Sequence, residues 1–293
     1  MAANVSSRVS HVLEGFPKPA PGRPGDPGLF GPRSMVWRVN GEIVVILGAG
    51  RALLMQIAHP LVAAGVADHS DFGVDAFARL WRTIDTVLTV AFGDTEQATA
   101  AADRVTGIHG RVVGTRDGRP YRALDPLLLL WVHATLVDTA LVTYERFVAS
   151  LTPSERERYY LEMKRFAAAF GVPPEVVPTD IAAFDGYLQE TLAGLDVTAE
   201  ARRLASGVLA PPVTPAWVPV RALFREATIG LLPERLRSGF GVAWTPARDR
   251  ALVAAAWTVR RTLRVLPANV RRWAHARAAV GRSEPKRGGY LGE

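Results

Sequence analysis

The chain has 293 residues, a formal net charge of +7 and no cysteine. Hydrophobic residues make up 48% of it, which excludes wholesale disorder. The missing cysteines exclude disulfides, thiolate zinc sites, iron–sulfur clusters and a cysteine nucleophile, so any metal must be held by His, Asp, Glu or Tyr. The N-terminal residues show neither an apolar signal segment nor a twin arginine, and we expect a cytoplasmic protein.

Proline and glycine dominate residues 17–33, "PKPAPGRPGDPGLFGPR", and this composition predicts an extended arm. From residue 34 the pattern becomes helical. We therefore expect three parts: a Pro/Gly-rich N-terminal arm over 1–33, one helical domain over 34–282 and a flexible tail over 283–293.

The stretch "VVILGAGRALLMQIAHP" (44–60) raises the question of a dinucleotide-binding turn, because an apolar run leads into Gly48-Ala49-Gly50. The full fingerprint needs a third glycine, a second strand and an acidic residue about twenty positions on. Asp68 and Asp71 lie at about that distance, but the third glycine is missing and the segment before them is not β-like. We therefore favour a helix.

In that helix, Gly48 and Gly50 either let another element approach the backbone closely or mark a break between two helical pieces. Pro60 disfavours helical geometry at the residue before it. The helix is thus expected to end or kink at His59.

Helical patterns continue along the chain. Residues 77–93 are amphipathic, a helix starts at Thr95, and "GTRDGRPYRALDP" predicts a loop or short hairpin turning at Asp117-Gly118. N-cap, proline and capping-box signals open helices after Asp125 and Thr152. Further helices are expected at 179–194, 197–208, 215–231 and 246–265. Strand signals are scarce, so we predict an all-α fold of about eight to ten helices in a single domain.

Two apolar stretches, 43–66 and 127–142, are candidates for membrane spans. The first is interrupted by Arg51, Gln56 and His59, and the second is short and contains His133. A spanning helix needs about 20 apolar residues in a row. We therefore expect two buried helices and no membrane span.

His133 lies in "LLLLWVHATLVDT", with apolar side chains one helical turn away on both sides. Such an imidazole is either a core histidine bonded to a carbonyl or hydroxyl, or an axial ligand to a flat apolar cofactor. His11, in the arm, and His275, in the basic C-terminal region, are expected to face solvent.

Arg79, Arg82 and Thr83 stand at positions i, i+3 and i+4, so they share one face of a helix. Two guanidinium groups and a hydroxyl can hold a carboxylate or polarise bound dioxygen. The alternative is an ordinary solvated polar face.

Several segments together resemble the MpaB-type oxygenases, which share a catalytic domain with the rubber oxygenase called latex clearing protein. They are "WRVNGE…GAGRALLMQIAHPLVAAGVADHSDF", "RLWRT…FGD", "IHGRVVG", "YRALDPLLLLWVHATLVDT" and "LLPERLRSGFGVAWTP". The resemblance runs from about Met35 to Arg282 and is specific for the bacterial, stand-alone branch of the family.

The resemblance implies a globin-like helical core around a haem b, with His133 as the proximal iron ligand. It implies that Arg79, Arg82 and Thr83 are polar residues of the distal pocket, although Arg82 replaces a lysine and the segment from Thr83 to His133 is longer than in the rubber enzyme. His59 is a candidate for the distal side or a propionate contact. His109 and Arg111 are candidates for propionate contacts.

The sequence thus predicts a haem b-dependent oxygenase or oxidase that uses dioxygen on a small apolar substrate. Two alternatives stay open: a non-haem iron site made from His59, His69 and Asp68 or Asp71, and a non-catalytic helical protein that binds haem or lipid. Nucleic-acid binding is not expected, because the arginine-rich C-terminal region suits a packed helix with a basic outer face.

Overall fold

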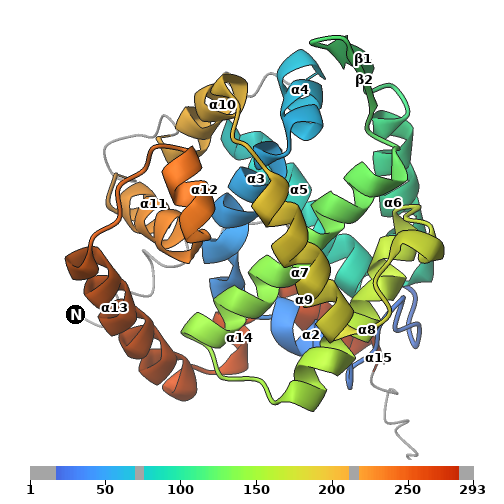
Figure 1. Ribbon diagram of the computed structural model, residues 1–293. Helices are drawn as coiled ribbons and strands as arrows, with labels where there is room; N and C mark the ends of the chain where they lie inside the picture. The colour runs from blue at the N-terminus through green and yellow to red at the C-terminus, as the bar shows by residue number, and fades with distance from the viewer. Residues whose placement is uncertain (1–17, 70–75, 211–217, 284–293) are drawn as a thin grey trace, which may run out of the picture.

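The computed structural model describes residues 18–69, 76–210 and 218–283. Within these ranges the chain forms fourteen α-helices, two short 3-10 helices and one two-stranded sheet (Figure 1). The all-α prediction is therefore confirmed. The helices outnumber the expected eight to ten because the chain breaks into several short pieces, among them α2 (Met35–Asn40), α12 (Glu234–Gly239) and α14 (Ala268–Arg271).

Helix α7 (Pro126–Phe147) is the longest helix of the described chain and contributes much of its core. It starts as the sequence predicts, because the Asp125 side chain accepts a hydrogen bond from the Leu127 amide at 2.9 Å and Pro126 occupies the first turn. Its length and composition would allow it to cross a membrane, but 72% of its most apolar 18-residue stretch is buried inside the protein. That burial is typical of the core helix of a folded domain.

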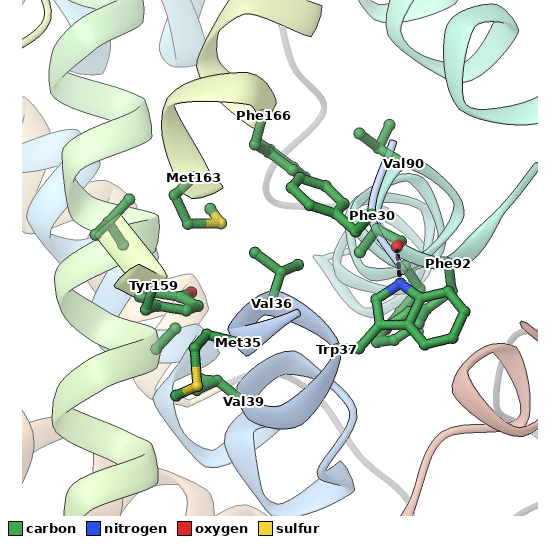
Figure 2. Close-up of a cluster of buried hydrophobic side chains, with 14 of the residues drawn as sticks. Phe30, Met35, Val36, Trp37, Val39, Val90, Phe92, Tyr159, Met163 and Phe166 are labelled. Atoms are coloured by element: carbon green, nitrogen blue, oxygen red, sulfur yellow. Dashed lines mark hydrogen bonds between the residues drawn. The ribbon is translucent and has the colours of Figure 1, made fainter. Parts of the chain in front are cut away.

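The largest hydrophobic cluster joins α7 to α2, α8 (Pro153–Ala169), α5 (Ala76–Phe92) and α15 (Ala274–Ser283). Figure 2 shows side chains of α8, α2 and α5 meeting in this cluster, with Trp37 donating a hydrogen bond from Nε1 to the Ala91 carbonyl at 2.9 Å. Methionine and aromatic side chains fill the space between the helices, so this part of the core is formed by helix-to-helix packing.

The segment 44–60 is not a strand, a turn and a helix. Ile43–Gly48 forms the 3-10 helix η1, and α3 (Ala49–Ala58) follows directly. The prediction that the glycines mark a break or a close approach is confirmed on both points. A Cβ at Gly48 would overlap the Thr143 hydroxyl of α7, and one at Gly50 would overlap the Thr228 hydroxyl of α11 (Val218–Leu231).

The expected kink at His59 is also present. Its backbone is extended (ψ 121°), and the η1–α3 segment meets α4 (Pro60–His69) at 104°. Proline at position 60 explains the break, because its ring disfavours a helical conformation in the residue before it.

The predicted hairpin is present as β1 (Val113–Arg116) and β2 (Arg119–Arg122), which pair antiparallel. Asp117 and Gly118 connect them with φ of 51° and 73°. Two successive positive φ angles are what a two-residue type I′ turn requires, and Asp-Gly is a preferred sequence for it.

The remaining helices agree with the expected ranges. They are α6 (Thr95–His109), α9 (Ile181–Gly194), α10 (Ala199–Leu209) and α13 (Pro246–Val265), with the 3-10 helix η2 (Pro174–Val176) before α9. Capping boxes open α6 and α8, and the second is the Thr152/Glu155 pair that the sequence predicts.

The described part of the N-terminal arm packs on the helical domain. The Arg23 amide donates to the Asp94 carboxylate at 2.6 Å, the Gly25 amide donates to the Arg282 carbonyl at 2.9 Å, and Phe30 is buried. The rest of the arm (1–17) and the tail from 284 lie outside the described residues.

Candidate functional site

His133 lies in the middle of α7 with 5% of its surface exposed. Its ring stacks on Phe166 of α8, with 6.2 Å between ring centroids and 26° between the planes. The neighbouring turns of α7 are apolar and buried, through Leu129, Leu130 and Val137. The imidazole therefore lies between two helices, in surroundings from which water is excluded.

Neither ring nitrogen of His133 has a hydrogen-bond partner among the described residues. Burial alone lowers the pKa of this histidine to about 4, so the ring is neutral at physiological pH. An unpartnered polar group in a protein core costs about 1–3 kcal/mol. The expected alternative, a core histidine bonded to a carbonyl or hydroxyl, is therefore not what the structure has. A neutral imidazole with a free nitrogen in an apolar wall fits the needs of an axial haem ligand.

The residues predicted for the distal pocket lie on α5. Arg82 and Thr83 are exposed, while Ile84 and Val87 of the same helix pack against the main core cluster. The side chain of Arg79 lies outside the described residues. Because His133 has no hydrogen-bond partner among the described residues, the structure does not bring Arg82 or Thr83 into hydrogen-bonding contact with its ring. Their distal role stays a prediction.

The candidates for propionate contacts lie on different elements. His59 is half-buried at the bend between α3 and α4, its Nδ1 has no partner in the described structure, and burial lowers its pKa against an opposing effect of Asp125. His109 ends α6 half-buried, and Arg111 is exposed just after it. His59 is thus near the N-terminal end of α7, whereas His109 and Arg111 precede the hairpin.

The proposed non-haem triad does not assemble from the described residues. His59 precedes α4 and His69 is its last residue, so the two lie about 15 Å apart along the helix axis at 1.5 Å per residue. Asp68 is engaged elsewhere: it accepts from the Tyr121 hydroxyl at 2.5 Å and pairs with Arg116. Within the described ranges no three His, Asp or Glu side chains are placed to hold a metal ion; Asp71 lies outside those ranges.

His275 corrects one expectation. It is 3% exposed on α15 and does not face solvent. Its Nε2 lies 3.3 Å from the Asp85 carboxylate of α5, without hydrogen-bonding geometry, and burial lowers its pKa although Asp85 opposes this. The arginines around it suggested a solvated segment, but Ala276 and Ala279 of α15, and Trp273 just before it, are buried in the main core cluster.

A buried ion pair that involves α7 was not predicted from the sequence. Arg51 of α3 is 4% exposed, and its guanidinium donates to the Asp138 carboxylate at 2.5 Å, to the Thr139 hydroxyl at 2.6 Å and to the Leu231 carbonyl at 2.7 Å. One side chain thereby ties α3 to α7 and α11. No sequence spacing links residues so far apart in the chain.

The fold and the site define a helical protein whose central helix carries a buried, neutral histidine. Residues 37–261 match the family described as "ER-bound oxygenase mpaB/B'/Rubber oxygenase, catalytic domain". The chain belongs to this family, and the resemblance drawn from its motifs is confirmed. Membership makes it an oxygenase-type enzyme and implies dioxygen with a metal or haem cofactor.

Two relatives are Uncharacterized protein Mb2261 of Mycobacterium bovis and Uncharacterized protein Rv2237 of Mycobacterium tuberculosis. Each is 30% identical over 225 residues, covering 73% of this chain and 87% of the relative. No solved structure matches the chain significantly. His133 and the distal candidates fall inside the family match, whereas His275 falls outside it.

Proposed function

We propose that the protein is a haem b-dependent oxygenase or oxidase that uses dioxygen on a small apolar substrate, with His133 as the proximal ligand. The observation that carries the proposal is the buried, neutral imidazole of His133, whose two nitrogens have no partner in the described structure. The oxygenase family supports the reaction class. We further propose a cytoplasmic location, with neither a membrane span nor a nucleic-acid partner.

His133 would hold the haem through one ring nitrogen, and a bound haem supplies the centre at which dioxygen is activated. The stacked ring of Phe166 restricts how the imidazole can turn. The surrounding leucines exclude water, which keeps the imidazole unprotonated and able to ligate. The same apolar surroundings favour an apolar substrate.

The polar candidates would act around the bound haem. Arg79, Arg82 and Thr83 would donate hydrogen bonds to developing negative charge on the distal side. His59, His109 and Arg111 would neutralise the propionates, for which cations and N–H donors are suited. Since Arg82 and Thr83 are exposed, their role requires that the N-terminal half of α5 faces the occupied pocket.

The experiment is a hemin titration of purified protein followed by its Soret absorbance, with and without dithionite and carbon monoxide. We expect one haem per chain and loss of that binding in His133→Gly, restored by added imidazole. His275→Gly is the matched control, because it removes another buried histidine, which lies on a different helix. It should bind hemin as the wild type does.

An unchanged Soret band in His133→Gly would refute the ligand assignment. Iron without porphyrin absorbance would select the non-haem alternative. Six-coordinate iron without oxygen consumption would select a haem-binding protein that is not an enzyme.

A further inference from the structure

A cavity of about 540 Å³ lies where α2, α13 and α14 meet the C-terminal end of α7. Its charged lining consists of one acid and five arginines: Glu42, Arg38, Arg260, Arg264, Arg271 and Arg272. The rest of the lining is mostly apolar, with the ring of Tyr144 and the side chains of Val148 and Leu263. A volume of this size suits a small organic molecule.

The positive charge of this cavity is only partly neutralised. Arg38 pairs with Glu155, and Arg271 lies 3.4 Å from Glu42. Arg260 donates to the carbonyls of residues 145 and 146, which carry no charge. Arg264 is exposed and has no acidic partner among the described residues.

Two residues that line the cavity each have a buried polar atom without a partner in the described structure. The Glu42 side chain is 5% exposed, and its Oε2 accepts no hydrogen bond. The Arg272 guanidinium donates through Nη2 to the Trp37 carbonyl at 2.7 Å, but its Nε is buried and unpaired. Native proteins rarely leave such groups unsatisfied without a ligand, ion or water to complete them.

We infer that this cavity binds a soluble phosphate ester. Planar guanidinium groups form paired hydrogen bonds with phosphate oxygens, and five arginines line this cavity. The apolar lining and the Tyr144 ring would contact the organic part of the ester. The Glu42 carboxylate would repel a ligand with several negative groups. A ligand with a single phosphate group therefore suits the cavity better than a polycarboxylate.

The cavity is separate from the proposed haem site. Tyr144 follows His133 by eleven residues of α7, which is about 16 Å along the helix axis. Eleven residues are close to three full turns, so both side chains leave α7 on nearly the same side, and the two sites are separated along the helix and not around it. The inference therefore adds a second ligand to the molecule and does not depend on whether His133 binds haem.

The test is isothermal titration of the purified full chain with AMP at low ionic strength. We expect saturable binding. In the Arg264→Gln/Arg271→Gln variant the affinity should fall about tenfold or more, as expected for losing charge-assisted hydrogen bonds. Glu42→Gln should bind AMP several-fold more tightly, because it removes the one negative charge of the lining. A circular-dichroism spectrum like that of the wild type establishes that each variant is folded.

Arg261→Gln is the matched control, since Arg261 lies on α13 like Arg264 but does not line the cavity. Its Cζ atom lies 4.9 Å from the centroid of the Trp257 ring. An equal loss of affinity in this control would indicate general attraction to a basic surface and would overturn the proposal. Citrate binding as tightly as AMP, binding to phosphatidylglycerol vesicles without binding to AMP, or no saturable AMP binding would each overturn it as well.

Discussion

Three histidines have at least one ring nitrogen that is buried away from water: His59, His133 and His275. Burial lowers the pKa of each, most clearly for His133, where it falls to about 4. In the unfolded chain a histidine titrates near pH 6.5. Between these values the unfolded chain binds more protons than the folded one, so acid lowers the free energy of unfolding.

We therefore expect the cofactor-free protein to lose stability between pH 7 and pH 5, and the His133→Leu variant to lose less. One pKa unit corresponds to about 1.4 kcal/mol, so removing the His133 contribution should reduce that loss by about 2 kcal/mol. Urea unfolding at both pH values measures it. His69→Leu is the control, because His69 is exposed. Equal losses in all three proteins would contradict the prediction.

Arg51 is the residue whose replacement should cost the most stability near the site. Arg51→Ala leaves Asp138 without its cation, and breaking a buried ion pair in this way costs about 3–5 kcal/mol. Arg51→Lys should recover only part of this loss. The lysine ammonium cannot reproduce the planar arrangement in which the guanidinium donates to three acceptors. Chemical denaturation measures both variants. A loss below 1 kcal/mol in Arg51→Ala would show that the pair is not important for folding.

At the scale of elements, the junction of η1 and α3 is held close to its neighbours by two glycines. Gly50→Ala places a methyl group against Thr228, with the Phe224 ring at 2.9 Å, and overpacking of this kind costs about 1–3 kcal/mol. Gly107→Ala in α6 is the matched control. Nothing lies within 4 Å of its added Cβ, so it should be neutral or stabilising by up to about 1 kcal/mol. Thermal unfolding compares the two; equal melting temperatures would refute the close-packing explanation.

Local signals predicted much of this element structure. Asp125-Pro126, Thr152 with Glu155, and the Asp117-Gly118 turn each determine a helix start or a hairpin through neighbours a few residues away. The kink before Pro60 is equally local. Such features depend on backbone conformation and on nearby side chains, which the sequence displays directly.

Features that join distant segments could not be predicted in the same way. The Arg51–Asp138 pair spans 87 positions, and the burial of His275 depends on which face of α15 meets α5. For the candidate site, the sequence supplied His133 and its apolar neighbours, but not the stacking on Phe166 or the absence of partners for its nitrogens. Those properties arise only when α7 and α8 pack together.

At the scale of the whole molecule, the described ends of the chain meet. Arg282 of α15 donates to the Asp26 carbonyl and the Phe92 carbonyl, each at 2.7 Å, and its own carbonyl accepts from the Gly25 amide. A ribosome makes residues 23–30 long before α15. The contacts between the arm and Arg282 can therefore form only once the last described helix has been synthesised. A chain that ends before residue 274 would keep the hydrogen bond from Arg23 to Asp94 but lose the contacts that Arg282 makes with the arm.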